Sequence, residues 1–132
     1  IDSNYEVIAH SDGDIVCHAI IDALLGACNL GDIGELAPSN EQNKDISSIK
    51  LLSKVSEIIS KAGFKIINID FTYVGEEPRL EKYKEIIGVS LAKALKMNPK
   101  DISCKATTTD GLGYEGALEG ISAQAVALVI KT

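Results

Sequence analysis

The sequence predicts a two-layer α/β domain in which a mixed β-sheet carries helices on one face. Extended and helical segments alternate in the order β-α-α-β-α-β-β, with about 30 residues between strands that flank a helix. The sheet face away from the helices is expected to be apolar and built of small side chains, which favours an oligomer interface. A length of 132 residues without an internal repeat predicts a single domain, residues 1–132.

The first expected elements flank a segment rich in turn-forming residues. Residues 5–8 are expected to form the end of a strand, and apolar residues at helical spacing predict a helix over 13–30. Ser11 or Asp12 is a natural N-cap for this helix, and Gly31 suits its left-handed C-cap.

A second helix is expected after a polar, irregular stretch. Residues 35–47 predict a surface loop, Ser47 or Ser48 can cap the helix that follows, and Gly63 is expected to end it. Residues 64–74 then alternate as a strand does. Simple alternation puts one set of side chains on a common face: Lys65, Ile67, Ile69, Phe71 and Tyr73.

The last third of the chain predicts one helix and two strands. Pro78 is expected to open the helix, and the Asn98–Pro99 pair to end it. Strands are expected at 102–108 and 121–131, with a glycine-rich loop over 110–116 between them. In the final strand, Val126, Leu128 and Ile130 share one face, and Ala123, Ala125 and Ala127 share the other.

Composition excludes several classes of protein. A net charge of −6 argues against a general nucleic-acid binder, and the absence of Trp disfavours a platform for stacking bases. The chain contains no run of about 18 apolar residues, so no membrane span is predicted. The three cysteines, Cys17, Cys28 and Cys104, are odd in number, widely spaced and without a C-x-x-C motif. This pattern suggests a reducing compartment.

The densest polar cluster lies at residues 9–18. Asp14 and His18 are four residues apart and share a helix face, so His18 could bind a metal through one ring nitrogen while a carboxylate orients the other. His10 precedes the expected helix start, where Ser11 and free N–H groups could hold a phosphate. A capped helix with two surface histidines remains the alternative, because one His and one Asp cannot complete a zinc site.

Two more segments could carry chemistry. Asp32, between two glycines, is either a helix cap or an acceptor for a sugar hydroxyl. Thr107, Thr108 and Thr109 follow Lys105 at a strand end and could present hydroxyls and amides to a phosphate. The alternative for the threonines is a β-branched strand with an exposed polar face.

Together these segments resemble the 2-C-methyl-D-erythritol 2,4-cyclodiphosphate synthase family of the non-mevalonate isoprenoid pathway. The most specific matches are A-H-S-D-G-D at 9–14 followed by His18, and K-A-T-T-T at 105–109. Further matching stretches extend over nearly the whole chain: 22–27, 31–34, 112–113, 119–121 and 125–128.

The resemblance implies a homotrimer around a central sheet-lined cavity, with active sites at the subunit interfaces. It implies conversion of 4-diphosphocytidyl-2-C-methyl-D-erythritol 2-phosphate to the cyclic diphosphate, with release of CMP. A zinc-type ion and a magnesium- or manganese-type ion would hold the phosphates. The implied partners are a small-molecule substrate and further copies of the chain, without nucleic acid or membrane. The implied location is the cytoplasm in a bacterium, and the plastid or apicoplast in a eukaryote.

The resemblance also assigns roles to individual residues. His10 and Thr108 match the stabilisers of the transition state, and His18 matches a zinc-binding histidine. The positions that it implies for substrate binding are His10, Ser11, Asp14, Asp32, Gly34, Glu77, Pro78, Arg79, Leu80, Thr107, Thr108, Thr109, Asp110 and Tyr114.

Three departures from the family pattern bear on function. The chain begins after the family's first strand, whose G-x-G-x-D-x-H motif carries the other zinc ligands, so weak or lost zinc binding is expected. Ser47 stands where many members have Asp, so the substrate contact of that position is not expected here. Ala117–Leu118 stands where Arg-Gly is common, and because that arginine lines the central cavity in the family, isoprenoid diphosphate binding there is not expected. A catalytically impaired trimeric paralogue that binds a nucleotide without turnover is the alternative function.

Overall fold

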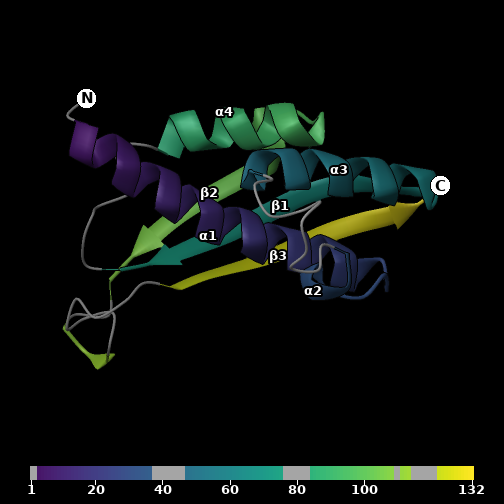
Figure 1. Cartoon of the computed structure of the whole chain (residues 1–132). Helices are drawn as coiled ribbons and strands as arrows, with labels where there is room; N and C mark the ends of the chain where they lie inside the picture. Colours follow the sequence, from purple (N-terminus) through teal and green to yellow (C-terminus); the bar gives the residue numbers. More distant parts are fainter. Residues whose placement is uncertain (1–2, 37–46, 76–83, 109–110, 114–121) are drawn as a thin grey trace.

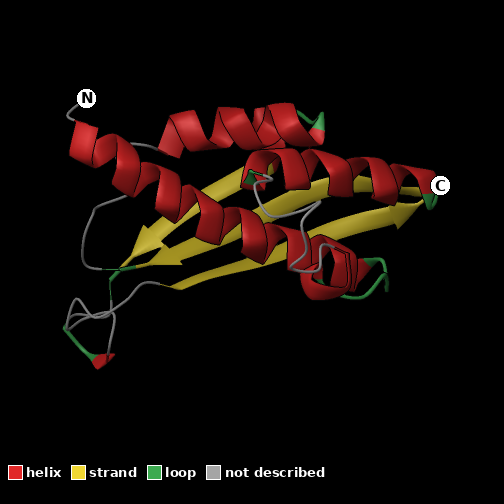
Figure 2. Cartoon of the chain, viewed as in Figure 1, coloured by secondary structure: helices red, strands yellow, loops and turns green. Residues whose placement is uncertain are grey.

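The computed structural model describes residues 3–36, 47–75, 84–108, 111–113 and 122–132, with side chains from residue 14 onward. Three strands form one layer, and α1, α3 and α4 lie together on one of its faces, as predicted (Figures 1 and 2). The elements in chain order are α1 (Ser3–Ala27), α2 (Ile33–Leu36), α3 (Ser48–Lys61), β1 (Phe64–Val74), α4 (Lys84–Leu95), η2 (Pro99–Asp101), β2 (Ile102–Thr107) and β3 (Ser122–Lys131).

Helix α1 begins earlier than the sequence predicts. Residues 5–8 lie in its first turns, so the expected strand end is wrong, and so is the expected N-cap at Ser11 or Asp12. The spacing of Ser3 and Glu6 matches an S-x-x-E helix start, and no proline interrupts the segment from there to Ala27.

The end of α1 also differs from the prediction. The helix ends at Ala27, and Asn29, not Gly31, takes the left-handed cap position, with a φ of 56°. The amide of Leu30 donates to the carbonyl of Leu25 at 2.9 Å, the backbone bond that closes such a cap. Asparagine can replace glycine here because its short polar side chain tolerates the left-handed region.

The remaining elements match the predicted ones closely. Ser47 is the N-cap of α3 and accepts from the amide of Lys50 at 3.2 Å, and Gly63 follows the helix with a φ of 90°. The two later strands begin and end within one residue of the prediction. Helix α4 ends before Asn98–Pro99 as expected, whereas its expected opening at Pro78 lies outside the described residues.

The sheet is mixed, with the order β2-β1-β3. Strand β1 is parallel to β2 and antiparallel to β3. The parallel pair is connected through α4 and η2, the arrangement that two parallel neighbours require. Within the described ranges, no helix combines the length and apolar content needed to cross a bilayer.

A register shift in β1 changes which side chains face the helices. The pairing with β3 slips between Ile66 and Asn68, as at a β-bulge. After the slip, Ile69 is 1% exposed and faces the core, whereas Ile67 before it is 37% exposed. The prediction that Lys65 and Ile67 share a face with Ile69 and the later residues of that set is therefore wrong, because the extra residue reverses the alternation.

The core lies between the sheet and the three helices. The alanines of β3 pack against this core, while Val126, Leu128 and Ile130 are exposed on the opposite face. The open face is therefore apolar along β3, as expected, but its side chains there are large, not small. The fully buried side chains of largest volume are Tyr73, Phe71, Ile20, Ile21, Leu24, Leu25, Leu52, Ile59, Ile69, Leu91 and Val16.

The bulge can be tested with the same substitution at two positions of β1. Replacing the buried Ile69 by Ala should lower the free energy of unfolding by about 2–5 kcal/mol, because a core cavity is created. Ile67→Ala should cost at most about 1 kcal/mol, because that side chain is partly in solvent. Urea unfolding of both variants measures the difference, and equal losses would show that the alternation continues through Ile67.

Candidate functional site

The described candidate residues fall into three regions: helix α1, the end of β2, and the α2 turn with Asp32 and Gly34. Helix α1 carries His10, Ser11, Asp14 and His18, and the end of β2 carries Thr107, which Thr108 follows. The N-terminal half of α1 lies at the same end of the sheet as the ends of β1 and β2 (Figure 1). The remaining predicted positions lie outside the described residues: Glu77, Pro78, Arg79, Leu80, Thr109, Asp110 and Tyr114.

The ends of the two parallel strands are held together. Val74 is paired with Thr107, and the amide of Gly75 donates to the Thr107 carbonyl at 3.1 Å. The Thr107 hydroxyl donates to the carbonyl of Thr108 at 3.2 Å. The carboxyl ends of parallel strands are the usual place for ligands in α/β sheets, so this edge is where the threonines can meet a phosphate.

His10 and Ser11 do not stand at a free helix N-terminus. Both lie well inside α1, where backbone N–H groups are paired with carbonyls four residues earlier. The interpretation of this segment as an anion site made of free helix amides is therefore wrong. Any contribution of these two residues to phosphate binding would have to come from their side chains.

His18 lies farther along α1 and contacts α3. Its Nε2 atom is 3.4 Å from the Oγ atom of Ser48, and the histidine is otherwise exposed. The sequence interpretation expected a carboxylate to orient the imidazole, but the partner resolved here is a hydroxyl. The sequence indicates Ser48 only as a possible helix cap, because no local spacing links it to His18, 30 positions earlier.

A complete metal site is not formed by the described residues. Among them, no three or more His, Cys, Asp or Glu side chains are grouped so that they could hold an ion. His18 is suited to be one ligand, because an imidazole with one nitrogen near a hydroxyl keeps the other nitrogen for a metal. Structural and catalytic zinc sites need three or four protein ligands.

Asp32 is the N-cap of the short helix α2, which was not predicted. Its Oδ1 atom accepts from the amide of Glu35 at 3.0 Å. Asp22, one turn before the end of α1, accepts from the amide of Ile33 at 3.1 Å. Asp32 therefore acts as a cap, but of a helix that the sequence does not predict, and not as part of the end of α1. Gly34 lies inside the same turn, so the cap also sets its position.

Lys105 is directed away from the helices. Its Nζ atom donates to Asp70 Oδ2 at 3.0 Å, and both side chains are about half exposed on the open face of the sheet. A solvent-exposed pair of this kind contributes little to stability. Lys105 thus lies on the strand that leads to Thr107 but is paired with a carboxylate on the neighbouring strand.

Cys17 is not suited to act as a nucleophile. It is 2% exposed, and burial, together with the negative charge of Asp14, raises the pKa of its thiol to about 12. The thiolate is the reactive form, so this neighbour of His18 is inert at neutral pH.

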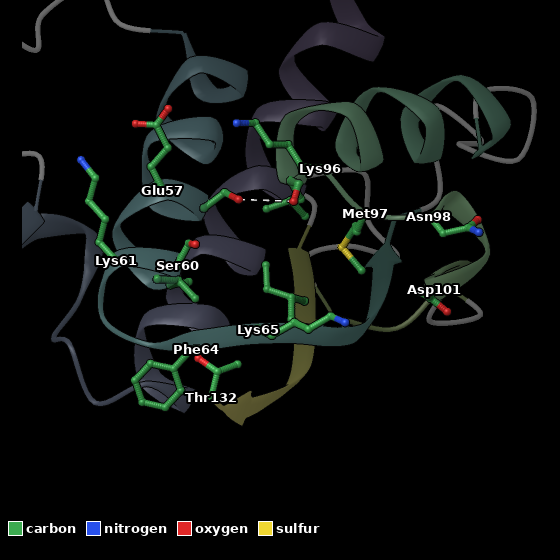
Figure 3. Close-up of a pocket in the computed structure, with 14 residues that line it drawn as sticks. Glu57, Ser60, Lys61, Phe64, Lys65, Lys96, Met97, Asn98, Asp101 and Thr132 are labelled. Atoms are coloured by element: carbon green, nitrogen blue, oxygen red, sulfur yellow. Dashed lines mark hydrogen bonds between the residues drawn. The ribbon is translucent and has the colours of Figure 1, made fainter.

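One surface cavity of about 680 Å³ lies at the other end of β1 (Figure 3). Its walls come from the last turns of α3 and α4 and from the first residues of β1, with Ile59 and Leu95 among its apolar contacts. Lys61 and Lys65 bring positive charge and Asp101 negative charge. None of the described candidate site residues lines this cavity, so the cavity is separate from the candidate site.

Comparison with known proteins gives a consistent match. The model of a family described as the YgbB family matches residues 1–130. The chain is 50% identical over 127 residues to a 2-C-methyl-D-erythritol 2,4-cyclodiphosphate synthase of Clostridium kluyveri, which covers 96% of the chain and 77% of that relative.

Two solved structures share the fold. The bifunctional IspDF of Campylobacter jejuni superimposes with a TM-score of 0.85 at 34% identity, over 89% of the chain and 32% of that protein. A CDP complex of IspF from Plasmodium falciparum gives a TM-score of 0.79 at 29% identity, over 89% of the chain and 71% of that protein.

The raised pKa of Cys17 predicts a loss of stability at alkaline pH. Between about pH 9 and pH 12 the thiol is ionised in the unfolded chain and protonated in the folded one, so the folded state binds more protons and stability falls as pH rises. Cys17→Ala should flatten this decline when the free energy of unfolding is measured across the window. Cys104→Ala should keep most of it, because Lys84 opposes the effect of burial there. Equal slopes in the wild type and Cys17→Ala would contradict the assignment.

Proposed function

The chain belongs to the YgbB family, and we propose that it converts 4-diphosphocytidyl-2-C-methyl-D-erythritol 2-phosphate to 2-C-methyl-D-erythritol 2,4-cyclodiphosphate and CMP. The observation that carries this proposal is the 50% identity to a synthase of that name over 96% of the chain. The chain is accordingly an enzyme of isoprenoid precursor biosynthesis, a phosphorus–oxygen lyase.

The reaction exchanges one phosphoanhydride bond for another. An oxygen of the 2-phosphate attacks the β-phosphorus of the diphosphate, the bond from that phosphorus to the bridging oxygen breaks, and CMP leaves with the bridging oxygen. Catalysis of phosphoryl transfer is mostly positioning and charge stabilisation. We assign stabilisation of the transition state to the His10 side chain and to Thr108, which follows the paired ends of β1 and β2.

The proposed substrate-binding residues lie in more than one place on the chain: the α2 turn, which carries Asp32 and Gly34, follows the C-terminal end of α1, away from the ends of β1 and β2 (Figure 1). Asp32 and Gly34 would hold the methylerythritol hydroxyls, and residues 77–80 would form the cytosine pocket. The CDP complex of the Plasmodium falciparum relative supports binding of a cytidine nucleotide. The further substrate contacts that we propose are Ser11, Asp14, Thr107, Thr109, Asp110 and Tyr114.

Two divalent cations are proposed as cofactors, one of the zinc type and one of magnesium or manganese. Bound cations would neutralise phosphate charge that a chain with a net charge of −6 cannot offset by itself. His18 would supply one imidazole ligand to the zinc-type ion. The chain's own contribution at this point is to hold that imidazole in place through α1 and α3.

A homotrimer with a central cavity and a bacterial cytoplasmic location complete the proposal. The exposed face of Val126, Leu128 and Ile130 supports contact with further copies, because an apolar row on a sheet face favours burial. The relative in Clostridium kluyveri supports a bacterial origin.

The activity and the role of Thr108 can be tested together. Incubation of the chain with Mg²⁺, Zn²⁺ and the diphosphocytidyl substrate should release CMP, measured by chromatography. Thr108→Ala should lower kcat by about 100-fold with little change in KM, because a contact that strengthens in the transition state is removed. Thr108→Ser should keep most of the rate.

Two results would contradict this account. Binding of CDP without any release of CMP would replace the enzyme by a nucleotide-binding paralogue. An unchanged kcat in Thr108→Ala would remove that residue from the chemistry while leaving the activity intact.

A further inference from the structure

Ser48 is a buried polar side chain, 9% exposed. It is the first residue of α3, and its Oγ atom lies 3.4 Å from Nε2 of His18 on α1. A buried hydroxyl needs a hydrogen-bond partner, and its contact here is a histidine whose remaining surface is open to solvent.

The place of this hydroxyl is fixed by the packing of two helices. Ser47 caps α3 and accepts from the amide of Lys50, so the helix starts at a defined residue. Leu51, three residues after Ser48 on α3, and Cys17, beside His18 in the sequence of α1, are both buried, at 5% and 2% exposed. The position of the Ser48 hydroxyl therefore follows from helix packing, and it meets the exposed His18 side chain at the surface of this packing.

We propose that Ser48 is a positioning residue for His18: its hydroxyl accepts a hydrogen bond from Nε2–H and leaves the Nδ1 lone pair available for a divalent cation. A neutral imidazole carries one proton, so a bond that keeps this proton on Nε2 selects the tautomer that can bind through Nδ1. The choice of a zinc-type cation rests on the proposed function, whereas the orientation of the ring does not.

A hydroxyl in this place differs from the carboxylate that the sequence suggested. It orients the ring without adding negative charge beside Cys17, whose thiol is already held in its neutral form. Without the hydroxyl, Nε2 would lose its fixed partner, and both tautomers would become accessible.

The test uses the whole chain, free of metal and labelled with ¹⁵N at histidine. Long-range ¹H–¹⁵N spectra at alkaline pH, where the imidazole is neutral, report which nitrogen carries the proton. We expect His18 to be in the Nε2–H form in the wild type and in Ser48→Thr, and to become a mixture of tautomers in Ser48→Ala. Ser56→Ala is the matched control, because Ser56 is a half-buried serine of the same helix whose hydroxyl donates to the Leu95 carbonyl.

Addition of Zn²⁺ gives the second measurement. The concentration needed to shift the Nδ1 signal should rise about 10- to 100-fold in Ser48→Ala, as for other partners that orient a metal-binding histidine. Ser48→Thr should recover most of the affinity, and Ser56→Ala should match the wild type.

An Nδ1–H tautomer in the wild type would overturn the proposal, and so would a Ser48→Ala variant with unchanged tautomer and Zn²⁺ response. Because these spectra need no substrate, they are independent of CMP release. If the chain releases CMP but the spectra do not respond to Ser48→Ala, only the positioning role fails. If the spectra respond and no CMP is released, the proposed function fails and the positioning role stands.

Discussion

Strand β1 is the element on which the rest of the structure depends. It is hydrogen-bonded along both edges, and Ile69, Phe71 and Tyr73 on its inner face are at most 1% exposed beneath the helices. Because its neighbour β2 runs parallel to it, the two strands end together, and the chain leaves both at Val74 and Thr107 side by side. Burial of one face and pairing of both edges therefore place the threonine segment at a defined edge of the sheet.

The packing of α1 on α3 provides the second fixed element of the candidate site. The apolar contacts between these helices bring His18 to Ser48, although 30 positions separate them in the chain. The proposed site would thus draw on a strand end, fixed by hydrogen bonds, and on a helix, fixed by apolar burial. The cavity near Ile59 and Leu95 lies at the opposite end of β1 and takes no part in this arrangement.

Alternation, glycines and prolines mark the limits of the three strands, so the sequence predicts the bounds of the strand at 64–74 without error, although not which face each of its side chains takes. The bulge at Ile67 was not predicted, because the alternation of residue types continues through it while the backbone slips. The predicted start of α1 is wrong because residues 5–8 fit either a strand or a helix when only four residues are considered. The candidate site residues follow from whole motifs, whereas the contact of Ser48 with His18 cannot be predicted in this way, because it arises from tertiary packing and not from local spacing.

The central claim is that the edge formed by the ends of β1 and β2 handles the phosphates of a cytidine nucleotide. Mapping the backbone amides of the ¹⁵N-labelled chain by NMR during addition of CDP tests it most directly. The account predicts shifts at Gly75, Thr107 and Thr108 and none around the cavity at Ser60, Lys65 and Met97. Shifts confined to the cavity residues would contradict it.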